Sequence, residues 1–238
     1  MALPSLVAPE YETIIPSTKQ PIRYRPFLVK EEKILYLAME SGEEKEILRA
    51  LMNLLDSCIL DDVDTNVLTT YDLEYLFLNI RAKSVNDVIA LNARHKDDTD
   101  CGHVTKIEVK IDDINIVNDE EHIYNLVLDE KTGLGLELKD PAALDLGEIA
   151  ETKDEFDAVF GMVYKCVKLV FDENNVYDSF TEKELRESIL DNLNQEQFEK
   201  LMKFFNTLPK LKHEVTYTCP KCEKEETIVI EGLQSFFT

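Results

Sequence analysis

Two cysteines, Cys219 and Cys222, are separated by two residues and flanked on both sides by β-rich sequence. Their thiolates can bind one Zn²⁺ when the backbone turns sharply between them, as in the knuckle of a zinc ribbon. A structural zinc ion needs four ligands, so this pair requires a second pair elsewhere in the chain. The spacing therefore predicts one half of a structural zinc site.

The second pair is predicted at Cys101 and His103, which precede an alternating, strand-like pattern. With Cys219 and Cys222 they form a Cys₃His ligand set. Because only one residue separates Cys101 from His103, less than the usual ligand spacing, His95 is the alternative fourth ligand. A site closed by four protein ligands leaves no position open for a substrate, so the predicted zinc is structural.

Two other interpretations of these thiols remain open, namely reduced cysteines without a metal and a redox pair. A redox Cys-x-x-Cys motif opens a helix in a βαβ unit, whereas Pro220 here lies in a predicted hairpin. The remaining cysteines, Cys58 and Cys166, fall on the apolar faces of predicted helices. We expect both to be buried and free, as small hydrophobic residues.

No catalytic motif accompanies these residues. The sequence contains no nucleophile elbow, no phosphate-binding glycine loop, no dinucleotide-binding glycine motif and no His-Glu-x-x-His. The acidic run 61–66 does not fit a calcium loop, because Val67 and Leu73 stand where glycine and glutamate are required. A hydrolase has only the abundance of carboxylates in its favour, so we predict a protein without enzymatic activity.

The composition narrows the class of partner. Across 238 residues, 26 Lys and Arg stand against 48 Asp and Glu, which gives a net charge of −22 at pH 7. This charge repels phosphate backbones, so neither nucleic acid nor an anionic membrane is an expected partner. No apolar stretch reaches the ~18–20 residues of a transmembrane helix. Residues 1–9 lack the basic region of a signal peptide, and we expect a reducing cytoplasm.

The hydrophobic periodicity changes along the chain and defines its predicted organisation. A capping box at Thr152 and Glu155 predicts a long helix whose apolar stripe continues to Phe171. The predicted regions are an extended arm over 1–30, a helical region over 31–95, a β-rich region with the first ligand pair over 96–145, a second helical region over 146–210 and a zinc knuckle hairpin over 211–238. The predicted fold class is α+β, with helical layers around a small antiparallel β module that carries a zinc-ribbon-like knuckle.

The predicted arm, residues 1–30, is unusual in composition. It holds five of the eight prolines and has a local charge of +2, whereas the rest of the chain is −24. Proline fixes φ and removes a hydrogen-bond donor, so this segment is predicted to be extended. It is either a strap on its own domain or an arm that reaches a neighbouring subunit.

Several segments carry a resemblance to a known family. They are residues 24–35 (YRPFLVKEEKIL), the turn at 40–42 (ESG), residues 81–85 (RAKSV), the metal-type ligands that follow, and residues 232–237 (GLQSFF). Over roughly 20–238 the chain resembles the T-even-type myophage baseplate hub assembly family. The family pattern has a second cysteine near Cys101, and His103 stands in its place here.

The resemblance implies a non-enzymatic phage tail protein that helps to build the central hub of the baseplate, as a hub subunit or as an assembly factor. The implied partners are other baseplate and tail proteins, met in the host cytoplasm during assembly or in the virion tail. Phe236 and Phe237 are a candidate contact segment, with burial against the protein's own sheet as the alternative. The alternative function is a zinc-ribbon-type factor associated with nucleic acid, against which the acidic residues around Cys222 argue.

Overall fold

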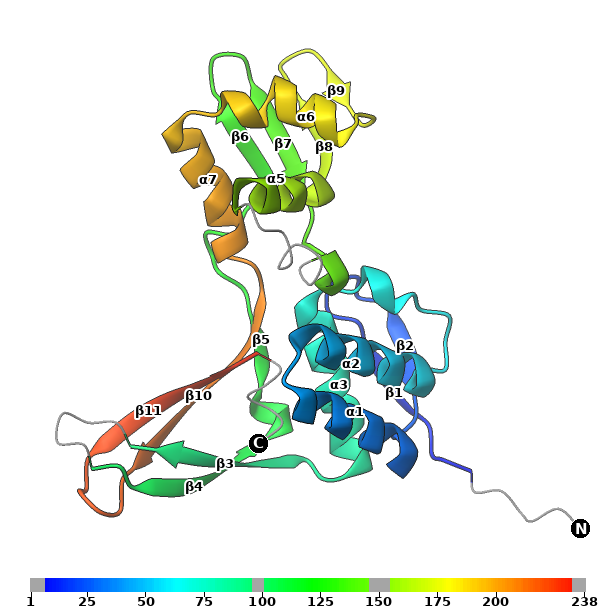
Figure 1. Cartoon of the computed structure of the whole chain (residues 1–238), viewed down its shortest axis with the longest axis vertical. Helices are drawn as coiled ribbons and strands as arrows, with labels where there is room; N and C mark the ends of the chain where they lie inside the picture. Colours follow the sequence, from blue (N-terminus) through cyan, green and yellow to red (C-terminus); the bar gives the residue numbers. More distant parts are fainter. Residues whose placement is uncertain (1–6, 96–100, 146–154, 233–238) are drawn as a thin grey trace, which may run out of the picture. The chain divides into compact units, whose positions relative to one another are not determined.

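The computed structural model describes residues 7–95, 101–145 and 155–232, and combines helices with small antiparallel sheets (Figure 1). The chain divides into two compact units. Unit 1 is formed by Met1–Val117 together with Lys210–Thr238, and unit 2 by Asn118–Pro209. Residues 236–237, the predicted contact segment, and Thr152 lie outside the described residues.

Unit 1 contains three helices and three small sheets in its described part. The helices are α1 (Val29–Ser41), α2 (Glu44–Cys58) and α3 (Thr70–Ser84), and the strands are β1 (Tyr11–Ile14), β2 (Pro21–Tyr24), β3 (Val88–Arg94), β4 (Val104–Lys110), β5 (Asn115–Val117), β10 (Lys210–Thr218) and β11 (Glu225–Glu231). The sheets are β1–β2, β3–β4 and β11–β10–β5, all antiparallel.

The helical layer of unit 1 follows from one apolar face on each helix. On α3 the buried residues include Leu73, Leu76, Phe77 and Ile80, which are spaced three and four apart on one side of the helix. Thr69 caps α3 by accepting a hydrogen bond from the backbone N–H of Asp72. The first N–H groups of a helix have no acceptor within the helix. The Thr69 side chain supplies one, so the local sequence determines where this helix begins.

Residues 11–24 form a hairpin that is attached to the helices of unit 1. β1 and β2 pair from Tyr11↔Tyr24 to Ile14↔Pro21, and Ile15 and Ile22 are buried. The Ser17 hydroxyl and backbone N–H both donate to the Asp72 carboxylate, at 2.6 and 2.9 Å. This part of the predicted arm is therefore a strap on its own unit.

Within the run at 24–35, Arg25 and Glu31 form an ion pair. The Arg25 guanidinium donates to both carboxylate oxygens of Glu31, at 2.7 and 3.0 Å, and to the backbone oxygen of Ser57 at 2.6 Å. Glu31 in turn accepts from the Leu28 backbone N–H at the start of α1. Arg25 thus joins the end of the hairpin, the start of α1 and the end of α2, where Cys58 is fully buried as predicted.

Two longer hairpins complete unit 1. β3 pairs with β4, and β10 pairs with β11 over Lys212–Thr218 and Glu225–Glu231. Burial alternates along β3, as expected when one face of a hairpin is covered. Within the described residues, no strand pairing links the β3–β4 sheet to the β11–β10–β5 sheet.

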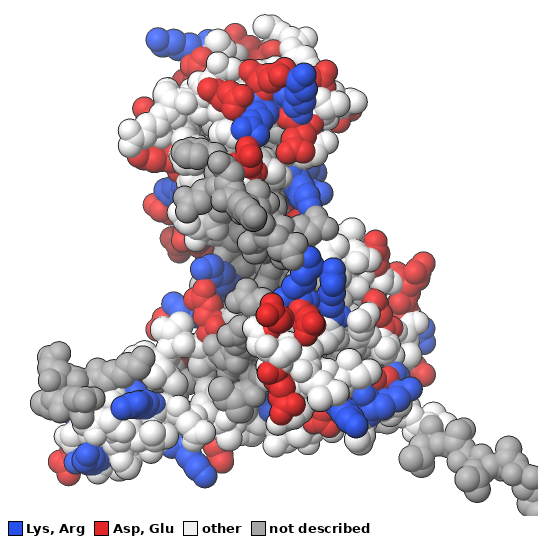
Figure 2. Space-filling view, in the orientation of Figure 1, with Lys and Arg blue, Asp and Glu red and all other residues white. Residues whose placement is uncertain are grey.

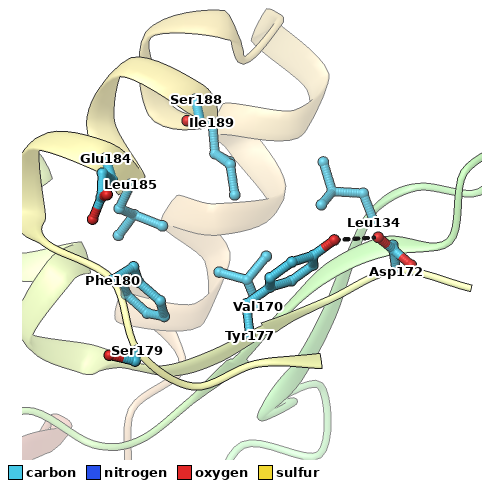
Figure 3. A pocket seen from close by; sticks show the side chains of 10 residues that line it. All are labelled: Leu134, Val170, Asp172, Tyr177, Ser179, Phe180, Glu184, Leu185, Ser188 and Ile189. Carbon is cyan, nitrogen blue, oxygen red and sulfur yellow. Dashed lines mark hydrogen bonds between the residues drawn. The ribbon is translucent and has the colours of Figure 1, made fainter. Parts of the chain in front are cut away.

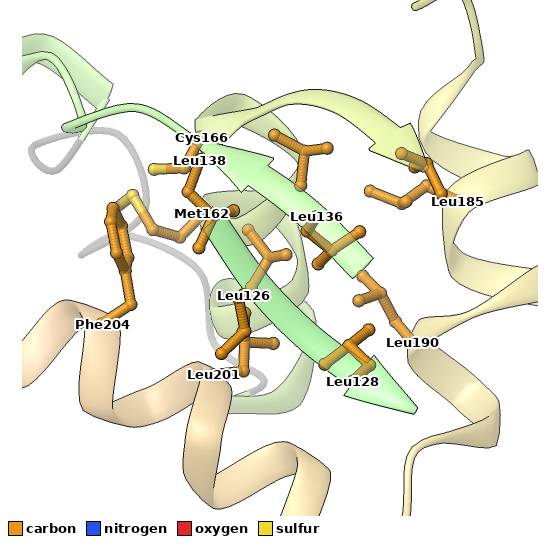
Figure 4. Close-up of a cluster of buried hydrophobic side chains, with 13 residues drawn as sticks. Leu126, Leu128, Leu136, Leu138, Met162, Cys166, Leu185, Leu190, Leu201 and Phe204 are labelled. Atoms are coloured by element: carbon orange, nitrogen blue, oxygen red, sulfur yellow. The ribbon is translucent and has the colours of Figure 1, made fainter. Parts of the chain in front are cut away.

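Unit 2 combines an antiparallel sheet with helices. The sheet order is β6 (Asn125–Asp129), β7 (Leu134–Leu138), β8 (Val167–Phe171) and β9 (Val176–Tyr177), and the helices are α5 (Glu155–Cys166), α6 (Glu182–Ser188) and α7 (Gln195–Asn206). Figure 4 shows leucines of β6 and β7 packed with Met162, Leu201 and Phe204 from the helices. Burying these side chains against one another provides the main stabilisation of this unit.

The helix predicted to run through Phe171 ends earlier. α5 stops at Cys166, which is fully buried, and β8 begins at Val167. The prediction of a continuous helix was wrong because Val167 and Val170, three residues apart, have helical spacing, and β8 buries both only through a shift in its register with β7. Pairing with β7 favours the strand, since β-branched residues pack well on a sheet.

Candidate metal centre

Four potential metal ligands converge at the ends of the two long hairpins of unit 1. They are His95, Cys101, Cys219 and Cys222, and their ligand atoms all lie within 4.8 Å of one another. The Sγ atoms of Cys101 and Cys219 are 3.9 Å apart, and the Cys222 Sγ is 3.3 Å from the His95 Nδ1. His95 and Cys219 are buried, whereas Cys101 and Cys222 are partly exposed.

These separations fit a tetrahedral ion. Zn–S bonds of about 2.3 Å place two tetrahedral sulfur ligands about 3.8 Å apart, and a shorter Zn–N bond places nitrogen and sulfur about 3.6 Å apart. The Cys101–Cys219 distance is close to the first value and far from the ~2.05 Å of a disulfide. Three thiols and one imidazole are a donor set typical of structural zinc, so the group can hold a metal.

Each hairpin contributes two ligands from its turn. His95 follows β3 directly and Cys101 precedes β4, while Cys219 follows β10 directly and Cys222 precedes β11. The second turn is tight, because the Cys219 backbone N–H donates to the Lys224 oxygen and the Glu223 N–H donates to the Cys219 oxygen, both at 2.8 Å. Glu223 has φ 60°, in the left-handed region, which such a turn requires.

Backbone amides and neighbouring thiols shift the pKa values of Cys219 and Cys222. Burial alone would raise the pKa of the Cys219 thiol, but the backbone N–H groups of Cys222 and Lys221 hold this pKa below its usual value. At Cys222, the backbone N–H of Lys224 acts in the same direction, yet the neighbouring Cys219 and Cys101 raise the pKa of this thiol. Three thiolates this close repel one another, and a bound cation removes that repulsion.

A carboxylate lies behind the imidazole. The Nε2 atom of His95 is 3.6 Å from a carboxylate oxygen of Glu226, on the side of the ring away from Cys222. The same oxygen accepts a hydrogen bond from the Tyr217 hydroxyl at 2.8 Å. Burial and this carboxylate raise the pKa of Tyr217 to about 12, so its hydroxyl remains a donor.

The structure brings together three of the four residues first predicted as ligands, Cys101, Cys219 and Cys222. The fourth member is His95, the alternative, and His103 is not in the group that the described residues form. The His103 backbone oxygen instead accepts the His95 N–H at 2.9 Å. The alternation of buried residues along β3 could have identified His95, because every second residue from Ile89 through Leu91 and Ala93 is buried and His95 is the next in this series.

Unit 2 has a cavity of about 500 Å³ between its sheet and α6 (Figure 3). Most of its wall is apolar, with Leu134, Phe180 and Ile189 among the lining residues. Its two carboxylates already have internal partners, because Asp172 accepts from the Tyr177 hydroxyl and Glu184 accepts from Thr181. The cavity could therefore accommodate an apolar group. Its lining residues do not form a pair of nucleophile and base.

A second polar cluster lies at the start and end of unit 2. The His122 Nδ1 is 2.9 Å from the Thr207 hydroxyl, and its Nε2 is 3.6 Å from Asp140. The order of groups resembles a nucleophile, base and acid. Thr207 is buried, however, and its hydroxyl also bonds the backbone oxygens of Lys203 and Phe204. The cluster therefore fastens the first and last segments of unit 2, a pairing that the sequence did not reveal.

Comparisons with known proteins identify the family. A family described as T4 bacteriophage base plate protein matches residues 8–238, nearly the whole chain. No match was found among curated proteins or among solved structures. Within the described residues, none of the helices has the length and apolar character needed to cross a bilayer.

Proposed function

The chain belongs to the T4 bacteriophage base plate protein family, and we propose that it helps to build the central hub of the baseplate, as a hub subunit or an assembly factor. It is a structural protein of the phage tail, and in this proposal it acts through contacts with other tail proteins and without enzymatic chemistry. The observation that carries the proposal is the closed group of His95 and three cysteines. All four tetrahedral positions are supplied by the protein, which favours a scaffold over a catalyst.

The metal of this group is one structural Zn²⁺ per chain, bound by His95 Nδ1 and the sulfurs of Cys101, Cys219 and Cys222. When bound, it supplies a fixed crosslink between hairpins that share no backbone pairing in the described residues. The Lys221 ammonium donates to the Cys101 backbone oxygen at 3.0 Å and adds a second link between the two turns. A fixed crosslink of this kind presents the two hairpins as one rigid surface.

The charge of the surface supports protein partners over nucleic acid. Red and blue side chains are interspersed on the face of each unit seen in Figure 2, without a continuous basic patch on that face. Glu223, Glu225 and Glu226 stand beside Lys221 and Lys224 around the second turn. A nucleic-acid-binding zinc ribbon needs an excess of basic residues there, because phosphate contacts provide most of its affinity.

Co-purification tests the proposed function. The tagged full chain is produced together with the other baseplate proteins of its phage, and the eluate is analysed by mass spectrometry and by absorbance at 260 nm. We expect at least one tail protein to elute in a fixed ratio, without nucleic acid. A Cys219→Ser variant should lose this partner if the hairpin surface makes the contact, whereas Cys166→Ala, a buried cysteine of unit 2, should keep it. Elution of nucleic acid, or of no tail protein, would contradict the proposal.

A further inference from the structure

Helix α1 presents an apolar face to solvent. Val29, Ile34, Tyr36 and Leu37 are 82, 57, 59 and 54% exposed, although each is a large hydrophobic residue. The opposite face of the helix, with the buried Leu35, already packs on unit 1. An ordinary surface helix carries polar residues on its outward side, so four exposed hydrophobic residues within three turns indicate a face that another surface covers.

The charges on this outward face are ordered along the helix. Lys30 and Lys33 lie toward its start, while Glu40 lies near its end. All three residues are exposed, and none of them forms an ion pair among the residues that the structure describes. Lys33, Tyr36, Leu37 and Glu40 share one stripe, because residues three and four apart lie on the same side of a helix.

Because the basic residues lie at one end of the face and the acidic residue at the other, two antiparallel copies of α1 place opposite charges next to each other. When two copies of α1 are placed antiparallel about a two-fold axis between Tyr36 and Leu37, Lys33 of each copy faces Glu40 of the other. Such an arrangement is isologous, since both copies use the same patch. Tyr36 then packs against Leu37 of the second copy, which removes the apolar surface of both side chains from solvent.

We propose that the chain forms a symmetric dimer through α1, with a second copy of itself as the occupant of this face. The proposal concerns self-association and is independent of the metal centre and of the hub partner. A single helix pair covers less surface than the ~800 Å² per partner of a standard interface. The dimer is therefore weak and concentration-dependent.

Charge exchange tests the pairing. Sedimentation equilibrium of the full chain, from 1 to ~200 µM at physiological salt, should show a monomer–dimer equilibrium. Lys33→Glu alone and Glu40→Lys alone should each weaken dimerisation about tenfold or more, because like charges then face each other. The double variant Lys33→Glu/Glu40→Lys restores opposite charges and should return to within about threefold of the wild-type value. Lys131→Glu, an exposed lysine of unit 2, is the matched control for net charge.

A second variant separates the face from its charges. Leu37→Asn removes apolar surface from an exposed position and should leave the circular dichroism spectrum unchanged, while dimerisation falls at least tenfold. A wild-type protein that is monomeric at every concentration would overturn the proposal, as would a double charge variant that stays as weak as the single ones. If Leu37→Asn instead abolishes co-elution of another tail protein from a monomeric chain, the face belongs to that protein and the proposal is wrong.

Discussion

The Nε2 atom of His95 lies 3.6 Å from the carboxylate of Glu226, while its Nδ1 faces the Cys222 sulfur at 3.3 Å. The two ring nitrogens therefore have different neighbours, a potential metal on one side and a carboxylate on the other. Metal-binding histidines usually donate their second N–H to a carboxylate, which fixes the tautomer and the ring orientation. Tyr217, paired with Glu226 across the β10–β11 hairpin, holds this carboxylate in place.

Replacing Glu226 should weaken the metal site without removing a ligand. We expect Glu226→Gln to lower zinc affinity by about 10- to 100-fold, because the imidazole loses the carboxylate that orients it. Competition with a chromophoric chelator measures the affinity. Glu225→Gln is the matched control, since Glu225 is the exposed neighbour of Glu226 on β11. Equal affinities for the two variants would show that Glu226 has no part in orienting His95.

Removing the metal should loosen the hairpin ends of unit 1. We expect chelation, or Cys219→Ser, to speed amide hydrogen exchange in β3, β4, β10 and β11, because the described strands of the two hairpins are otherwise unpaired with each other. Exchange in the core of unit 2 should stay unchanged. Metal analysis of protein prepared without chelator should find about one zinc per chain, and Cys166→Ala should retain it. A chain without any transition metal would refute the zinc assignment.

The two histidines can be compared directly. His95→Ala should lower zinc retention, because the His95 Nδ1 lies among the three sulfurs. His103→Ala should retain the metal, since the contact from His103 to this region is made by its backbone oxygen, which the substitution leaves in place. Metal content after gel filtration is the measurement. Zinc loss in His103→Ala alone would favour the ligand set first predicted from the spacing.

Local signals predicted the parts of this molecule that depend on neighbouring residues. Capping boxes, formed by Thr181 with Glu184 and by Asn194 with Gln197, stand at the starts of α6 and α7, and the Cys-x-x-Cys spacing predicted a turn with two potential ligands. His95 lies in the group of potential ligands because it continues the buried side of β3 after Ile89, Leu91 and Ala93. Periodicity did not separate α5 from β8, because the deciding interaction is pairing with β7.

The pairing of β5 with β10 was not predicted either, because it also depends on residues far apart in the sequence. The chain leaves unit 1 after β5 and returns at β10, where Val117 pairs with Lys210. Ninety-two residues separate these two positions in the sequence, and no local pattern marks them as partners. The predicted sequential regions therefore gave no indication that unit 2 is an insertion into unit 1. At residues 11–24, proline content predicted extended backbone and left open whether this segment lies on its own unit or on a neighbouring subunit.

The strap should depend on Asp72. Its carboxylate accepts hydrogen bonds from Ser17 and from Thr69, and it is fully buried. We expect Asp72→Ala to lower the free energy of unfolding by about 1–3 kcal/mol or more, because several buried donors lose their acceptor. Thr69→Ala should cost about 1 kcal/mol, the usual value for a lost cap. Urea titrations followed by circular dichroism compare the two, and an Asp72→Ala protein as stable as wild type would contradict this role.

The Arg25–Glu31 pair should make unit 1 sensitive to acid. The hydrogen bond from Arg25 holds the pKa of Glu31 below its usual value, even though burial acts in the opposite direction. A carboxyl group whose folded pKa is depressed stabilises the fold above its unfolded pKa, about 4.3 for glutamate, and this stabilisation is lost as the pH falls through the folded pKa. Glu31→Gln should therefore be less stable than wild type by about 2 kcal/mol at pH 7, and the difference should shrink as the pH is lowered to 3. Urea titrations at both pH values measure it, with the exposed Glu46→Gln on α2 as the control. A difference that stays constant with pH would show that the charge of Glu31 contributes nothing to the stability of unit 1.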